Sequence, residues 1–155
     1  QGFAYEAAAL VLLLYAASGP VGAVGGGLLA DRLGRKAIIL GSQILGPLAV
    51  LAALTASGWP AAAAFVFAGV MLSATFSVGV VYGQELMPGS PATVSGFMAG
   101  FAWGTAGLVL GPLGAVADRY GLAVGFGTLA ALALLAAVLL LPLPETGPRR
   151  GGQVV

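Results

Sequence analysis

Side chains that could do chemistry are scarce in this sequence, and four of them stand close together. The chain has eleven charged residues in 155, and four of these lie between positions 31 and 36: Asp31, Arg32, Arg35 and Lys36. It has no cysteine and no histidine, which removes disulfides, thiolate metal sites and the commonest physiological proton carrier. The sequence also lacks a recognisable catalytic triad, metal-ligand cluster or phosphate loop. We therefore expect no enzyme activity, no metal site and no cofactor.

One enzyme-like pattern overlaps this cluster. The stretch GGGLLA at 25–30, followed by Asp31, has some likeness to a dinucleotide-binding fingerprint. That fingerprint needs a strand before it and a soluble βαβ unit around it, and the sequence here provides neither. A net charge of +1 also argues against nucleic acid as a partner. The charged cluster therefore needs an explanation outside catalysis and nucleotide binding.

The composition places the chain in a lipid bilayer. Its mean hydropathy is +1.04, with 59% apolar and only 7% charged residues. The uncharged stretches are each long enough for the roughly 20 residues that cross about 30 Å of hydrocarbon, and the turn SGWP at 57–60 divides the second of them. Backbone groups in hydrocarbon must be satisfied within the segment, which requires helices. We predict an all-α, polytopic bundle of five transmembrane helices, with spans near 7–30, 37–57, 61–84, 92–116 and 122–143.

The basic residues predict how these spans are oriented. Three of them follow the first span, Arg149 and Arg150 follow the fifth, and only Arg119 lies on the other side. Because Lys and Arg near span ends stay on the cytoplasmic side, we expect the first loop and the C-terminus to be cytoplasmic. The prediction is a multi-pass protein of the cell membrane, the bacterial inner membrane, with residues 144–155 as a flexible cytoplasmic tail.

The charged cluster is half of an internal repeat. Residues 27–34 read GLLADRLG, and 87 residues later residues 114–121 read GAVADRYG, identical at five of eight positions. Three spans separate the copies, so they lie on opposite faces of the membrane, as an inverted-topology repeat requires. The matching residues are Gly27, Asp31, Arg32 and Gly34 in the first copy and Gly114, Asp118, Arg119 and Gly121 in the second.

Three ordered motifs resemble the major facilitator superfamily of transporters. GGLLADRLGRKAI, at 26–38, is similar to the family's signature loop between the second and third helices of each six-helix half. VYGQELMPG, at 81–89, resembles the end of the tenth helix, and LPETG, at 143–147, resembles a motif that often follows the twelfth. The resemblance implies a C-terminal half without its first helix, from helix eight to helix twelve. We expect a fragment of a longer protein, since the chain begins at Gln1 shortly before a span.

Within the superfamily, the run from Gln84 to Gly121 is most similar to drug exporters of the fosmidomycin-resistance type. Ala92 stands where sugar porters usually have an arginine. The resemblance implies secondary transport of a small molecule by alternating access, as proton-coupled drug efflux by an antiporter. Its expected partners are the lipid bilayer, the small-molecule substrate, protons and the missing N-terminal half. The alternatives are an importer of sugars or organic anions, and a membrane scaffold subunit that transports nothing.

The resemblance also implies a gating site. Its residues are Gly27, Asp31, Arg32, Gly34, Arg35, Lys36 and Glu85. Gly27 would let a neighbouring helix approach closely, and Gly34 would permit the sharp reversal into the next span. Asp31 would hold the N-terminal end of a helix from the opposite half. The three basic residues would form ion pairs that close the cytoplasmic gate, with Glu85 paired to Arg32 or Arg35.

The resemblance further implies a substrate cavity lined by the first, third and fourth spans, with the second and fifth as scaffold. At 100° per residue, Ser73, Ser77 and Gln84 share one face of the third span, while Thr75 and Tyr82 lie on the opposite face. The cavity candidates are Tyr15, Ser73, Ser77, Tyr82, Gln84, Phe97, Phe101 and Trp103. The middle of every span lacks an ionisable residue, so we expect the coupling carboxylate in the missing N-terminal part, with Glu85 as a weaker candidate.

Overall fold

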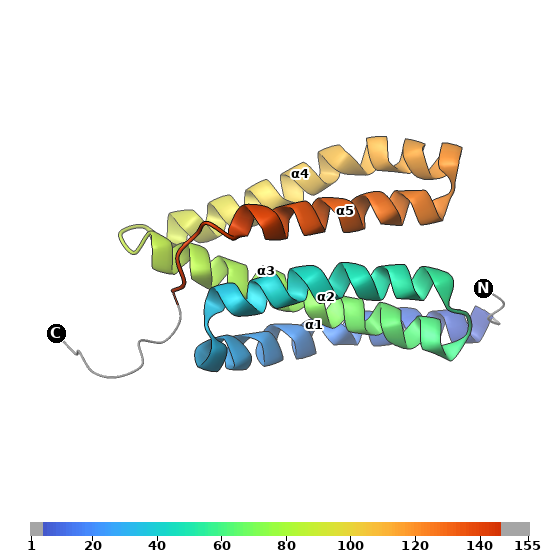
Figure 1. Ribbon diagram of the computed structural model, residues 1–155, viewed down its shortest axis with the longest axis horizontal. Coiled ribbons are helices and arrows are strands. Elements are labelled where there is room, and N and C mark those ends of the chain that lie inside the picture. The colour runs from blue at the N-terminus through green and yellow to red at the C-terminus, as the bar shows by residue number, and fades with distance from the viewer. Residues whose placement is uncertain (1–4, 147–155) are drawn as a thin grey trace.

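The computed structural model describes residues 5–146, which fold into five α-helices (Figure 1). In chain order they are α1 (Tyr5–Leu33), α2 (Arg35–Thr55), α3 (Trp59–Leu86), α4 (Pro91–Tyr120) and α5 (Leu122–Leu140). All five are long and apolar enough to cross a membrane. The predicted fold class and the predicted number and order of spans are confirmed.

The helices extend beyond the predicted spans, into the charged motifs. Asp31 and Arg32 lie in the last turn of α1, where the sequence analysis expected a loop. The loop is a single residue, Gly34, whose φ of 103° and ψ of 150° reverse the chain sharply. Gly121 has nearly the same conformation between α4 and α5, with φ 92° and ψ 156°. Charge marks where a chain leaves hydrocarbon, but the helix itself continues until a residue breaks it, and glycine tolerates positive φ at little cost.

The helices form two layers (Figure 1). One layer contains α1, α2 and α3, with α3 packed against both of the others, and α4 and α5 lie side by side in the second. Contacts between α2 and α5 and between α3 and α4 join the layers. The α1–α2 turn, the α3–α4 connection and residues 141–146 share one end of the bundle, here called the Gly34 end. The α4–α5 turn lies at the opposite Gly121 end, so the repeat is inverted as predicted.

The α1–α3 contact depends on small residues. A Cβ added to Gly22 would lie 2.2 Å from the carbonyl oxygen of Val70, and one added to Gly26 would lie 2.6 Å from Cβ of Ala74. No described atom comes within 4 Å of a Cβ added to Gly27. The close approach expected at Gly27 is made at Gly26 and Gly22. Apolar surface gains little from helix contact inside a bilayer, so close backbone approach and van der Waals packing hold such helices together.

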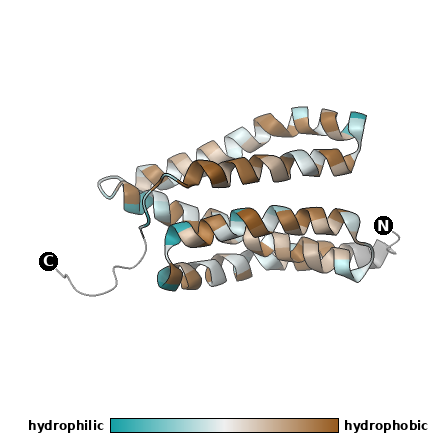
Figure 2. Ribbon diagram, in the orientation of Figure 1, coloured by the Kyte–Doolittle hydropathy of each residue, from teal (hydrophilic) through white to brown (hydrophobic). Residues whose placement is uncertain are grey.

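Helix α4 is the most open of the five. Val94 is its one buried residue within the part of the chain described here. Its glycine stripe, Gly96, Gly100 and Gly104, has no described atom within 4 Å of the added Cβ positions. Figure 2 shows that apolar residues cover most of the helix surfaces, while hydrophilic residues gather at the helix ends. That distribution suits a bundle surrounded by lipid.

Candidate functional site

An arginine links two carboxylates at the Gly34 end. Arg35 is the first residue of α2, and its Nη1 donates to Oδ1 of Asp31, one turn earlier on α1. Its Nε donates to Oε1 of Glu85, near the end of α3, at 3.2 Å. The sequence predicts that Glu85 pairs with Arg32 or Arg35, and the structure confirms Arg35. The Arg35 side chain is only 16% exposed, so the two carboxylates neutralise a charge that would otherwise be costly at the edge of the hydrocarbon.

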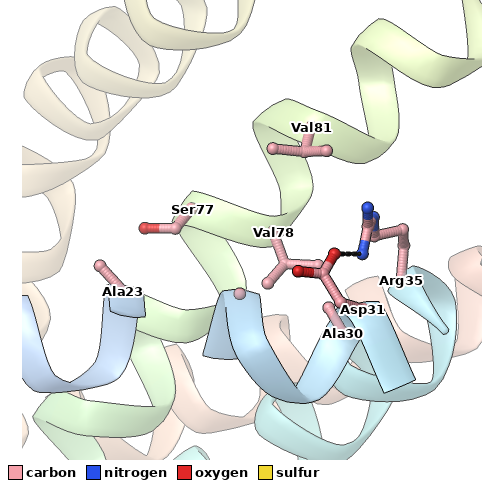
Figure 3. Close-up of a pocket in the computed structure, with 8 residues that line it drawn as sticks. Ala23, Ala30, Asp31, Arg35, Ser77, Val78 and Val81 are labelled. Carbon is pink, nitrogen blue, oxygen red and sulfur yellow. Dashed lines mark hydrogen bonds and ion pairs between the residues drawn. The ribbon is translucent and has the colours of Figure 1, made fainter. Parts of the chain in front are cut away.

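A cavity of about 280 Å³ opens beside this network (Figure 3). It lies between α1 and α3, and its lining residues are Ala23, Gly27, Ala30, Asp31, Arg35, Ser77, Val78 and Val81. Figure 3 shows the Asp31 carboxylate meeting the Arg35 guanidinium on one side, with Ser77 on the neighbouring helix. Three of the lining side chains, Asp31, Arg35 and Ser77, are polar, and the rest of the wall is apolar. A few polar groups in an apolar lining are typical of a small-molecule site.

The other two basic residues behave differently from Arg35. Lys36 donates from Nζ to the backbone oxygens of Leu141 and Leu143, both at 2.7 Å. Arg32 is exposed, and its side chain makes neither an ion pair nor a hydrogen bond to any residue between 5 and 146. Of the three basic residues, Arg35 is therefore the one that forms ion pairs within residues 5–146, and the ion pairs that would close the gate stay a prediction. The partners of the Lys36 ammonium are backbone carbonyl oxygens that follow α5, and not carboxylates.

The segment after α5 makes contacts that sequence reasoning missed. Glu145 accepts hydrogen bonds from the backbone N–H groups of Lys36 and Ala37, at 3.0 and 3.2 Å. The Tyr82 hydroxyl donates to the Pro144 oxygen at 2.6 Å. Of the tail predicted as flexible, residues 144–146 are described and two of them hold these contacts; residues 147–155 lie outside the described residues. The available signal was the rarity of charge, since Glu145 is one of only five acidic residues.

Two cavity candidates, Tyr15 and Tyr82, make contacts with other parts of the chain. The Tyr15 ring stacks on Phe65 of α3, with ring centroids 4.7 Å apart. Tyr82 is buried, and its hydroxyl is already bonded to the chain after α5. A tyrosine in an apolar helix needs a partner for its hydroxyl or its ring, and here another part of the chain supplies that partner. A substrate contact by either tyrosine stays a prediction.

The predicted faces of α3 are confirmed for Ser73, Ser77 and Thr75. Ser77 lines the cavity on the α1 side, and Ser73 faces α1 at Gly19. Thr75 points the other way, and its hydroxyl lies 2.6 Å from the hydroxyl of Ser42 on α2. This hydrogen bond crosses between two helices inside the apolar region, where an unpaired hydroxyl would be costly.

The remaining cavity candidates lie at or on α4. Gln84 donates from Nε2 to the Ser95 hydroxyl at 2.6 Å and so joins α3 to α4. The rings of Phe97 and Phe101 stack with centroids 5.4 Å apart, and both are exposed. Trp103 is 74% exposed. A substrate contact by these exposed aromatic residues stays a prediction.

The second copy of the repeat has the turn but not the charge network. Asp118 and Arg119 are exposed at the end of α4, and neither forms an ion pair within residues 5–146. No described atom lies within 4 Å of a Cβ added to Gly114 or Gly121. Across the same residues, no three acidic side chains come together as a metal site would need. The two ends of the bundle are thus alike in backbone and different in chemistry.

Comparison with known proteins gives two related sequences. The chain is 44% identical over 115 residues to "Uncharacterized MFS-type transporter YfnC" of Bacillus subtilis (strain 168), covering 72% of this chain and 27% of that protein. It is 36% identical over 136 residues to "Fosmidomycin resistance protein" of Escherichia coli (strain K12), covering 86% of this chain and 33% of that protein. The chain spans about a quarter to a third of the length of these relatives. No protein-family model and no solved structure matches it.

Proposed function

The chain belongs to the major facilitator superfamily of transporters, and on that premise we propose that the protein carrying it exports a small toxic molecule by alternating access. The strongest support for export is the similarity to the fosmidomycin resistance protein, which extends over 86% of the chain, because that protein is named for drug resistance. Five apolar helices with an inverted repeat support the transport part of the proposal. The chain would supply helices eight to twelve of such a transporter.

The proposed coupling ion is the proton. A charged residue inside hydrocarbon is rare and usually functional, and the described helices have none near their middles. In this proposal, the coupling carboxylate belongs to a part of the transporter beyond this sequence. Glu85 is a weaker candidate, because it lies near the end of α3 and is already paired with Arg35.

We assign the Gly34 end to the cytoplasm and the Arg35 network to the gate at that end. The concentration of basic residues supports this orientation. Arg35 joins the ends of α1, α2 and α3 through Asp31 and Glu85, so these three ends would move together when the gate closes. Asp31 stays 64% exposed, which leaves its carboxylate accessible to a positively polarised helix N-terminus from the other half of the transporter.

Drug susceptibility tests the proposal. We expect bacteria that produce the protein to tolerate more fosmidomycin than bacteria that lack it, and the Asp31→Asn variant to lose this tolerance at equal abundance in the membrane. Equal susceptibility of producing and non-producing cells, across fosmidomycin and a panel of amphipathic drugs, would refute the export reading. Increased susceptibility would instead indicate an importer.

A further inference from the structure

At the Gly34 end, a residue after α5 caps the beginning of α2, and a residue of α2 caps the end of α5. The Glu145 carboxylate, from the segment after α5, accepts the N–H groups of Lys36 and Ala37 in the first turn of α2. In return, the Lys36 ammonium from α2 donates to the carbonyl oxygens of Leu141 and Leu143, just after the last residue of α5, Leu140. A negative group therefore caps a helix N-terminus and a positive group caps a helix C-terminus, and both match the helix dipoles.

Gly34 makes this exchange possible. A Cβ there would lie 2.7 Å from Cδ of Glu145 and 2.9 Å from each carboxylate oxygen, so the carboxylate rests directly over the glycine. The positive φ of Gly34 also turns the first N–H groups of α2 toward the segment after α5. The motif glycine thus has two requirements, a backbone conformation and an absent side chain.

The second copy of the repeat shows that the turn does not need such a cap. Gly121 has the same backbone conformation, yet no described atom lies within 4 Å of its added Cβ. Ala123 stands at the position equivalent to Lys36. The exchange is therefore an addition at one end of the bundle and not a consequence of the turn itself.

We propose that Glu145 and Lys36 form a reciprocal cap clamp between α2 and α5, and that Glu145 is the positioning residue that holds Arg35 toward Glu85. Arg35 is the residue immediately before Lys36, so the clamp fixes the helical turn from which the guanidinium reaches α3. The bond from Tyr82 to Pro144 ties the same segment to α3. The role in gating rests on the proposed function, whereas the clamp itself is a property of the fold.

Amide hydrogen exchange of the protein that carries this sequence, in lipid nanodiscs, tests the clamp without any transport assay. The variants are Glu145→Gln, Lys36→Met and, as the matched control at the opposite end, Asp118→Asn. Loss of a helix cap corresponds to roughly five- to tenfold faster exchange of the affected amides. Because the caps are reciprocal, we expect either clamp variant to accelerate exchange in both residues 35–40 and residues 138–146. The control variant is expected to change neither segment.

Two results would overturn the clamp. One is acceleration confined to the helix end that lost its own cap, which would mean two independent caps. The other is no acceleration in either segment. Exchange in residues 124–134 serves as the folding check, and if Glu145→Gln loosens that region too, Glu145→Asp takes its place.

The positioning role has a separate readout. We expect Glu145→Gln to remove most of the energetic coupling between Arg35 and Glu85, measured by a double-mutant cycle of thermal unfolding in the two backgrounds. Unchanged coupling in the Glu145→Gln background would refute the positioning role even if the clamp is real. Neither measurement uses a substrate, so failure of the drug-export proposal would leave both results interpretable.

Discussion

Arg35 and Glu85 stand fifty positions apart in the chain, and Nε of the arginine lies 3.2 Å from Oε1 of the glutamate. This pair connects the beginning of α2 to the end of α3 at the Gly34 end. The same guanidinium also reaches Asp31 at the end of α1. One side chain therefore joins the ends of three helices.

The Arg35–Glu85 pair has a measurable coupling energy. We expect Arg35→Gln and Glu85→Gln each to lower thermal stability, and the double variant to lose less than the sum. The expected coupling is about 1 kcal/mol, at the upper end for exposed ion pairs, because Arg35 is largely shielded from solvent. Differential scanning fluorimetry of the purified protein and its three variants measures it. Strict additivity of the two single effects would contradict a direct interaction.

Asp31 and the pair Arg35 with Lys36 are expected to fail in different ways. Asp31→Asn should impair conformational switching while membrane insertion stays normal, since an aspartate has no use as a topology signal. Removing both positive charges, by Arg35→Gln with Lys36→Gln, should also disturb topology. The chain has no cysteine, so a single cysteine introduced at Ser57 reports the side reached by an impermeant thiol reagent. Identical labelling of both variants and the parent would contradict this separation.

Gly26 and Gly27 form a matched pair for testing the α1–α3 contact. We expect Gly26→Ala to destabilise the protein by about 1–3 kcal/mol, because the new Cβ would lie 2.6 Å from that of Ala74 and the helices would have to separate. Gly27→Ala meets no described atom and is expected to be neutral or to gain about 0.5–1 kcal/mol from helix propensity. Thermal unfolding of the two variants compares them directly. Equal losses would show that Gly26 is not the contact point.

The Ser42–Thr75 hydrogen bond is a further link between α2 and α3. We expect a double-mutant cycle with Ser42→Ala and Thr75→Val to give about 0.6 kcal/mol, the usual size of an interhelical hydrogen bond in a membrane protein. Either hydroxyl has a carbonyl oxygen of its own helix within reach as an alternative acceptor for its one proton, which keeps the single losses small. A coupling indistinguishable from zero would mean that the two hydroxyls do not depend on each other.

Tyr82 connects α3 to the segment after α5 through one hydroxyl. Tyr82→Phe keeps the ring and removes the bond to the Pro144 oxygen, and we expect a loss of about 1 kcal/mol of stability. If Tyr82 instead contacted substrate, the variant would change transport affinity while stability stayed constant. Thermal unfolding together with the concentration dependence of transport separates these two outcomes.

The fold was predictable from sequence because charge is so rare in this chain. Each gap between charges holds one span, or two where the SGWP turn divides it, and one glycine at the end of each motif copy gives the turn. The pairing of Glu85 was also predictable, since a lone acidic residue near the end of an apolar helix needs a nearby cation. These conclusions depend on patterns within one segment or on scarce charges that must find each other.

The missed features depend on packing that a single sequence does not encode locally. The sequence does not distinguish Gly22, Gly26 and Gly27. Only the way in which α1 crosses α3 decides which of these glycines is in contact. Glu145 was assigned to a flexible tail because hydropathy ends before it, although its carboxylate caps a helix that begins 110 positions earlier. The hydrogen bond from Tyr82 to the Pro144 oxygen was not predictable, because a tyrosine suits a binding site as well as it suits a hydrogen bond to the backbone.

Fosmidomycin flux in proteoliposomes tests the central claim most directly. The protein that carries this sequence is purified and reconstituted, and radiolabelled drug is followed across the membrane under an imposed proton gradient. We predict flux above that of protein-free liposomes, dependent on the gradient and slowed by Asp31→Asn. Flux equal to that of protein-free liposomes, for fosmidomycin and for the drugs to which producing cells are tolerant, would contradict the account.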